Sequence, residues 1–359
     1  MKRAIKIQAG KKAIEKIEKR GFSQDLITGM LGASGGPKWL ILSELDKYLS
    51  STFFKYRETP LHLLGSSVGS WRFAAYAGKN PEKSIEIFRD SYTNFGYRYK
   101  DLDPAKIDID ILSKLSIDML HSFIKDDDIE YIVNNPIFRL NIISAKCRGI
   151  LKSENRISLS LGLGIAALTN AIDRNNLKYF FKRALFYSDK SSPFYAVDDM
   201  PTEKIRLSKN NLLDSLMASG SIPLVTYGVK NIEGTSRKDI YRDGGIIDYH
   251  FDIDLNIDEG IVLYPHFYDF ALPGWFDKLY KKRKLSPKKY ENIVMISPSK
   301  ELMNKLPNRK LTDRKDFQNF DFDTRIKNWK TVIDMGRYMV DDFSEMVEKD
   351  QFLDRVKQF

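Results

Sequence analysis

Cysteine, histidine and long apolar runs are scarce in this sequence of 359 residues. It holds one cysteine, Cys147, and four histidines. A single thiol excludes an internal disulfide and a cysteine-rich zinc cluster, and it suits a reducing, cytoplasmic setting. No stretch approaches the roughly 18 apolar residues of a membrane span, and the basic N-terminus has no uninterrupted apolar core like that of a signal peptide. We therefore expect a cytoplasmic protein that does not span a membrane, and we assign it no metal or cofactor.

The composition is that of a folded protein, with 42% hydrophobic and 12% aromatic residues. These residues are spread along the whole length, so every segment has apolar surface to bury against its ordering entropy. The length permits two or three domains, or one large α/β domain with helical additions.

The net charge of +10 is concentrated in two segments. Residues 1–20 hold eight lysines and arginines against two glutamates, and residues 275–290 hold seven against one aspartate. The second segment interleaves its lysines with Trp275, Phe276, Leu279, Tyr280 and Tyr290. Aromatic rings beside cations suit the interface of an anionic membrane, whereas a solvated lysine-rich loop is the alternative. We expect peripheral contact with the inner face of the membrane and no nucleic-acid partner, because no recognisable nucleic-acid-binding pattern accompanies the charge. The oligomeric state stays open.

Strands and helices are expected to alternate along the chain. Residues 3–20 read as a surface helix that ends near Gly21. Apolar strands are expected at 25–31, 61–64, 138–144, 184–187, 205–207, 239–242, 261–264 and 293–296. Such alternation predicts an α/β fold with a mostly parallel central sheet sandwiched by helices. We divide the chain into an N-terminal amphipathic helix (1–21), a main domain (22–300) and a C-terminal helical extension (301–359).

The turn GSSVG, from Gly65 to Gly69, matches the nucleophile elbow G-x-S-x-G. It lies between an expected strand and an expected helix, which is the context that presents a serine hydroxyl outward on a sharp turn. Glycines on both sides of Ser67 remove side chains that would clash in the bend. Ser67 is therefore the candidate nucleophile.

A second glycine-rich turn, GASGGPKW, runs from Gly32 to Trp39. Adjacent Gly35 and Gly36 leave their backbone N–H groups unobstructed before a helix that opens at Pro37. The turn does not match a P-loop, which needs lysine directly after glycine and then a hydroxyl residue. The remaining candidate role of this turn is to stabilise an oxyanion through the N–H groups of Gly35 and Gly36.

The third pattern is Asp243, Gly244 and Gly245, directly after an expected strand. An aspartate at the carboxyl end of a strand lies at the edge where open α/β sheets place their sites. By itself this pattern could equally be a common Asp-Gly turn.

Together, GASGGPKW, GSSVG and DGG, with ASGSIP (Ala218–Pro223) before the last, resemble the motifs of the patatin-like phospholipases. The resemblance covers about residues 25–265 in matching order. Two positions of the glycine loop depart from the family pattern, since Ser34 replaces its first glycine and Trp39 its last.

The resemblance implies a lipid-degrading serine hydrolase with a catalytic dyad. Ser67 would attack the carbonyl of a lipid ester, Asp243 would take the hydroxyl proton as general base, and Gly35 and Gly36 would form the oxyanion hole. Gly65, Gly69, Gly244 and Gly245 would be the structural glycines of these motifs.

Two alternatives stay open. His266 follows the strand after Asp243, so the order Ser, Asp, His of an α/β-hydrolase triad is available, while His62, His121 and His250 are expected to be packing or surface residues. The chain could also be a catalytically weak membrane-surface binding protein of the same fold.

A dinucleotide-binding pattern is a further, weaker reading. Gly162, Gly164 and Ala167 fit G-x-G-x-x-[GA], but residues 157–172 equally read as one apolar helix in the core.

Overall fold

The protein is described by a computed structural model that covers residues 3–96, 108–255, 257–280, 283 and 287–359. Within these residues, ten strands form one sheet, in the order β10-β1-β9-β8-β2-β3-β4-β5-β6, with β7 beside β4. The strands are β1 (Ile5–Ala9), β2 (Ile27–Gly32), β3 (Leu61–Ser66), β4 (Phe138–Cys147), β5 (Phe181–Tyr187), β6 (Thr202–Arg206), β7 (Tyr241–Asp243), β8 (Ile261–Pro265), β9 (Ile293–Pro298) and β10 (Val356–Gln358).

The centre of the sheet is parallel. Strands β9, β8, β2, β3 and β4 run in the same direction, and antiparallel pairing is confined to β1–β9, β4–β5 and β4–β7. The central strands are buried along almost their whole length, as strands covered on both faces must be. The expected α/β class with a mostly parallel sheet is confirmed.

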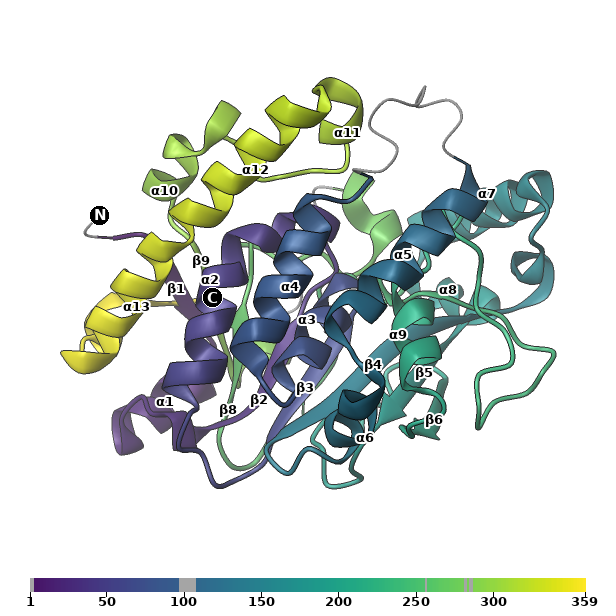
Figure 1. Ribbon diagram of the computed structural model, residues 1–359. Coiled ribbons are helices and arrows are strands. Elements are labelled where there is room, and N and C mark those ends of the chain that lie inside the picture. Colours follow the sequence, from purple (N-terminus) through teal and green to yellow (C-terminus); the bar gives the residue numbers. More distant parts are fainter. Residues whose placement is uncertain (1–2, 97–107, 256, 281–282, 284–286) are drawn as a thin grey trace.

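Helices lie between and after the strands. Those of the first half are α1 (Lys11–Arg20), α2 (Ser43–Tyr48), α3 (Val68–Tyr76), α4 (Pro81–Thr93), α5 (Ile109–Phe123), α6 (Asp126–Asn134) and α7 (Arg156–Ile172). Those of the second half are α8 (Leu177–Phe180), α9 (Leu212–Gly220), α10 (Lys300–Lys305), α11 (Asp316–Asn319), α12 (Phe322–Met335), α13 (Arg337–Glu348) and α14 (Phe352–Arg355). Figure 1 shows α2, α4 and α5 in front of the sheet, with α12 and α13 beside them.

Both ends of the chain differ from the expected single helix and purely helical tail. Residues 5–9 form the strand β1, which lies between β9 and β10, and the helix begins only at Lys11. The alternation of Ile5, Lys6, Ile7 and Gln8 places the isoleucines on one face of the sheet, which is the pattern of a half-buried strand. One continuous core cluster holds Ile7, much of the main domain and the C-terminal Trp329, so the three expected segments share their packing, while a smaller cluster packs around α7.

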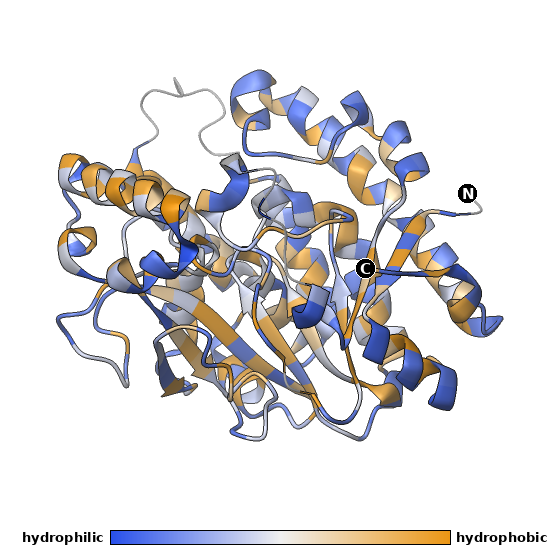
Figure 2. Cartoon of the chain, turned by 180° about the vertical axis from the view of Figure 1, so that it is seen from behind, coloured by the Kyte–Doolittle hydropathy of each residue, from blue (hydrophilic) through white to orange (hydrophobic). Residues whose placement is uncertain are grey.

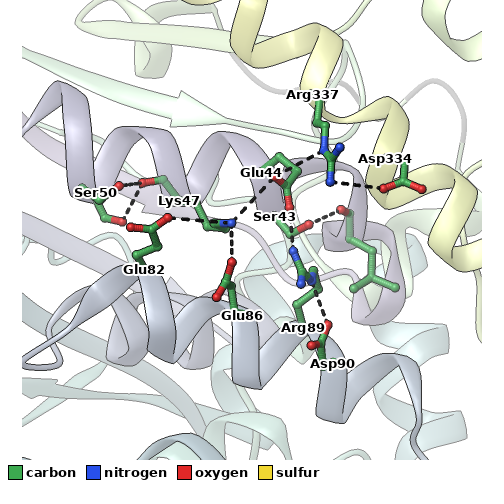
Figure 3. Close-up of polar contacts among 12 residues, drawn as sticks. Ser43, Glu44, Lys47, Ser50, Glu82, Glu86, Arg89, Asp90, Asp334 and Arg337 are labelled. Atoms are coloured by element: carbon green, nitrogen blue, oxygen red, sulfur yellow. Dashed lines mark hydrogen bonds and ion pairs between the residues drawn. The ribbon is translucent and has the colours of Figure 1, made fainter.

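A cluster of charged side chains joins the C-terminal helices to α2 and α4 (Figure 3). Glu44 accepts a hydrogen bond of 2.6 Å from Arg89 of α4, and its other oxygen lies 3.9 Å from Arg337 of α13. Lys47 donates to Glu86 at 2.5 Å. The cluster therefore fixes α2, which follows the glycine loop, against helices from two distant parts of the chain.

Candidate active site

Ser67 and Asp243 lie side by side, and the sheet explains how. Strand β3 pairs with β4 until Ser66 lies opposite Ile143. Where β3 ends, β7 pairs antiparallel with the next residues of β4 and sets Asp243 opposite Ser144. The two strand ends thus meet beside β4, and the hydroxyl of Ser67 donates a hydrogen bond of 2.7 Å to Oδ2 of Asp243.

Ser67 lies on the sharp turn expected of a nucleophile elbow. Its φ of +55° is a conformation that residues with a side chain rarely adopt, and it stores roughly 1–3 kcal/mol of strain. A side chain at Gly65 would overlap the backbone of Ser70, and one at Gly69 would overlap the carbonyl of Gly32. The two motif glycines therefore allow β3, α3 and the glycine loop to pack backbone against backbone.

Ser219 supports this strained turn. The ASGSIP stretch stands out in the sequence, but this role of Ser219 was not predicted from it. The backbone N–H of Ser67 donates to Oγ of Ser219 at 2.9 Å, and Ser219 donates in turn to the carbonyl of Ile143 at 2.6 Å. The hydroxyl at the end of α9 thus ties the elbow to β4.

Asp243 is held in one orientation. Its Oδ1 accepts a hydrogen bond of 2.7 Å from the backbone N–H of Gly245, which leaves Oδ2 for Ser67. A side chain at Gly244 would overlap the backbone of β4. Burial raises the pKa of Asp243 above its ordinary value, while the nearby Arg314 cation and the hydrogen bond from Ser67 oppose the rise.

Gly35 and Gly36 line different cavities that meet at Ser67. Gly35 lines a small cavity and Gly36 lines a larger one, and Ser67 lines both. No described residue accepts a hydrogen bond from the N–H of either glycine. Gly36 has φ +56°, and a side chain at Gly35 would overlap the ring of Phe267, so both positions need glycine. The helix expected to open at Pro37 begins as a 3₁₀ helix (Gly36–Leu42) and continues as α2.

Ser34 and Trp39, the two residues that differ from the family's glycine loop, both contact neighbouring residues. The hydroxyl of Ser34 donates to that of Ser66 at 3.0 Å and so links the glycine loop to the elbow. Trp39 is fully buried and stacks on Phe88, with ring centroids 4.7 Å apart. Both substitutions therefore serve packing around the loop.

Two cavities meet at Ser67. The smaller, of about 120 Å³, has both charged and apolar side chains in its wall and holds Asp243. Its lining also includes Ser34, Gly35, Lys38, Ile222, Pro223, Gly245, Ile246, Tyr249, Trp275, Lys278, Asp313 and Arg314. The larger, of about 560 Å³, is mainly apolar, with Val68, Trp71, Phe95, Leu112, Leu115, Met119, Val225, Phe317 and Phe320 in its wall. A hydroxyl between a chamber with charged side chains and an apolar one suits an amphipathic ester.

His266 lines neither cavity. Its Nδ1 contacts the backbone of Tyr268, its ring packs against His250 at 4.4 Å between centroids, and burial lowers the pKa of His266 to about 3. The direct hydrogen bond between Ser67 and Asp243 leaves no place for an imidazole between them. The geometry gives the triad alternative no support.

The dinucleotide pattern also lacks its context. Gly162, Gly164 and Ala167 all lie inside α7, which follows a 3₁₀ segment rather than a strand. The expectation that this helix lies in the core holds for only one of its sides. Ile157, Leu161, Ile165, Leu168 and Ile172 on the other side are 40% to 83% exposed.

Neither a metal cluster nor a membrane span is present in the described part of the chain. No three His, Cys, Asp or Glu residues there are grouped so that they could hold a metal ion. None of its helices is both long and apolar enough to cross a bilayer.

Comparisons with known proteins add little to this geometry. No family model matches the chain, and no curated protein matches its sequence. Among solved structures, it is similar to VipD from Legionella pneumophila, with 13% sequence identity and a TM-score of 0.29. The match covers 76% of this chain and 55% of that one, so the chain spans about half the length of VipD. At this identity and TM-score the match carries no argument about activity, and the case for a function rests on the site itself.

Proposed function

We propose that the chain is a serine acyl hydrolase of patatin-like type that acts on lipid esters. The observation that carries the proposal is the 2.7 Å hydrogen bond from Ser67 to Asp243 on a strained strand-to-helix turn. The ordered motifs of the sequence support the same assignment, because each of them contributes residues to this one place.

In the acylation step, Oγ of Ser67 attacks the ester carbonyl carbon and its proton moves to Oδ2 of Asp243. The carbonyl oxygen becomes an oxyanion, which accepts hydrogen bonds from the free N–H groups of Gly35 and Gly36. Collapse of the tetrahedral intermediate breaks the ester bond, and the leaving alcohol takes the proton from Asp243.

In the deacylation step, water attacks the acyl-serine and gives its proton to Asp243. A second collapse releases the fatty acid and returns the proton to Ser67. A carboxylate is a weak base for a hydroxyl, and the burial that raises the pKa of Asp243 makes it a stronger one.

The larger cavity supports a lipid as the acyl donor. At about 560 Å³, with leucine, methionine and aromatic side chains in its wall, it has room for an alkyl chain beside Ser67.

Fluorophosphonate labelling tests this function. Wild-type protein should be labelled covalently and should hydrolyse short-chain and phospholipid esters. Ser67→Ala should lose labelling, and Ser67→Ala and Asp243→Asn should each lose activity by at least about a thousandfold. His266→Gln is the matched control and should keep most of the activity.

Loss of activity in His266→Gln with activity retained in Asp243→Asn would favour the triad instead. A wild-type protein that neither labels nor hydrolyses any ester of the panel would contradict the hydrolase, and a membrane-surface binding protein of this fold would then be the better description.

We further propose that α7 places the molecule on an anionic bilayer. The helix carries no charged residue from Ile157 to Ile172, and its exposed side is a row of leucines and isoleucines. Figure 2 shows it at the upper left, hydrophobic over most of its length. Exposed cations lie near both ends, with Arg156 at its first residue and Lys178 in the segment that follows, although the exposed Asp173 directly follows Ile172. An apolar face flanked by cations fits the interface of an anionic membrane.

The basic segment 275–290 adjoins this helix. Arg283 donates to the carbonyls of Asn170 and Ala171 near the end of α7. Lys281, Lys282 and Lys284 lie outside the described residues. The lysines of the N-terminal segment are a weaker candidate, because Lys12 pairs with Glu291 at 2.6 Å and Lys16 donates to Asn292 and two backbone carbonyls.

A further inference from the structure

Two cations in the wall of the small cavity form no ion pair with a described residue. Lys278 follows Asp277 in the 3₁₀ segment Trp275–Leu279, and Arg314 precedes α11. Both line the cavity that holds Ser67 and Asp243; Lys278 lines this cavity alone, whereas Arg314 also lines the larger one. Within the described residues, neither side chain forms an ion pair, whereas Lys38 in the same wall is paired with Asp313.

The backbone of Lys278 is held in place by its neighbour in sequence. The buried carboxylate of Asp277 accepts hydrogen bonds from Asn170 at 2.9 Å, from Arg174 at 2.8 Å and from Arg283 at 2.7 Å. The ammonium of Lys278 lies 3.9 Å from the centre of the Tyr249 ring. Its direction toward the cavity is thus set by the folded protein before any ligand arrives.

Arg314 is held against the glycine loop. Thr312 donates through its hydroxyl to the carbonyl of Pro37, and Asp313 pairs with Lys38. The guanidinium consequently lies next to Gly36, where a side chain at that glycine would come within 3.0 Å of Nε. A residue from the C-terminal extension therefore stands at the loop proposed to hold the oxyanion.

Cationic side chains outnumber carboxylates in the wall of this cavity. Lys38, Lys278 and Arg314 face Asp243 and Asp313, and Asp313 is already paired with Lys38. Burial, Arg314 and Lys38 lower the pKa of Lys278 to about 7, an effect that the solvent-exposed part of this side chain moderates. A bound anion would relieve the repulsion, and about 120 Å³ is room for a small anionic group.

We infer that Lys278 and Arg314 form a subsite for an anionic group, of the phosphate or carboxylate kind, that the ester substrate carries close to its scissile bond. The inference rests on the proposed function, since the larger cavity on the other side of Ser67 takes the acyl chain. The anion then belongs to the alcohol part of the ester. A guanidinium and an ammonium are the donors that such a group binds through charge-assisted hydrogen bonds.

Two esters that differ only in a phosphate test the subsite: octanoylglycerol phosphate and octanoylglycerol, both monomeric at pH 7. The wild type should prefer the phosphate ester in kcat/KM. At a pH on the plateau above the acidic limb of Asp243, Lys278→Gln and Arg314→Gln should each lower kcat/KM for the phosphate ester by roughly tenfold or more, and change that for the neutral ester by less than about threefold. The control Lys315→Gln removes the same charge from a residue next to Arg314 that does not line the cavity, and it should change neither.

An equal fall on both esters would overturn the inference, because the cations would then act on the reaction rather than on a substrate anion. The same holds if neither variant differs from the wild type. In both cases the hydrolase itself still stands.

Inorganic phosphate separates this result from a failure of the proposed function. It should raise the Tm of the wild type but not that of Lys278→Gln or Arg314→Gln, and this holds even if the wild type hydrolyses neither ester. No rise in the wild type would contradict the subsite. A rise without any preference between the esters would show a site for free phosphate and overturn its assignment to the substrate.

Discussion

At the scale of single residues, close contacts explain which residue type occupies the motif positions. Gly65 and Gly69 are glycines because backbones meet there, and Gly36 also leaves space for Arg314. Ser67 has a strained φ that Ser219 and Asp243 hold by hydrogen bonds. Strain that neighbours maintain is typical of functional positions, where a side chain must point in one direction.

The pH dependence of hydrolysis should reflect Asp243. As a base it must be ionised, so kcat/KM should fall as the pH drops through its pKa, which burial raises above the ordinary value. The Arg314 cation favours the ionised form, and its removal should raise this pKa. The acidic limb of Arg314→Gln should therefore move to higher pH on a neutral soluble ester.

This shift is measured from profiles of kcat/KM between about pH 4 and pH 8. Lys315→Gln should leave the limb in place. A limb that stays fixed in Arg314→Gln, or moves to lower pH, would contradict the electrostatic coupling of Arg314 to Asp243.

At the scale of elements, a buried ion pair joins the helices that follow the two glycine motifs. Arg72 of α3 donates through Nε and Nη2 to Asp46 of α2, at 2.8 and 2.7 Å, and Tyr76 adds a third hydrogen bond at 3.0 Å. Both charged side chains are fully buried. Because α2 follows the glycine loop and α3 follows the elbow, the pair keeps the two halves of the site in register.

Asp46→Ala should lower the free energy of unfolding by about 3–5 kcal/mol, because Arg72 would be left as a buried charge without its partner. Urea denaturation followed by circular dichroism measures the change. Glu15→Ala removes an exposed partner of Lys11 and should cost less than about 0.5 kcal/mol. Similar values for the two variants would mean that the buried pair has little effect on stability.

Much of the sheet was predictable because its strands are buried apolar runs between glycine turns. The strand β1 was missed since its lysine and glutamine resemble one face of an amphipathic helix, and β10 is only three residues long. Ser67 and Asp243 are found from local motifs. Lys278 and Arg314 could not be found in this way, because their place in the cavity depends on how distant segments dock.

At the scale of the whole molecule, the proposed membrane face and the cavities belong to one body. Asn170 of α7 and Arg283 of the basic segment bind the same carboxylate, that of Asp277, and the next residue lines the cavity beside Ser67. A bilayer that receives α7 would thus lie at a fixed position relative to the site.

The double variant Leu161→Asp with Leu168→Asp should weaken binding to anionic liposomes by roughly tenfold or more, because burial of each leucine is worth about 1.5–3 kcal/mol. Co-sedimentation with liposomes measures the binding. Hydrolysis of a soluble ester should be unchanged. Leu353→Asp alters an exposed leucine on α14 and serves as the control.

Unchanged sedimentation of the double variant would exclude α7 as the membrane face. Equal loss in the control would indicate a general effect of added negative charge.

The contact between Thr312 and Pro37 also bears on the order in which the site forms during folding. It joins residues 275 positions apart, whereas the hydrogen bonds of Ser67 to Ser219 and Asp243 span 152 and 176 positions. Contacts between distant residues form late in folding, since the loop that they close must first be ordered. A refolding molecule would therefore complete the pair of Ser67 and Asp243 before Arg314 is held beside the glycine loop, and its selectivity would mature after its activity.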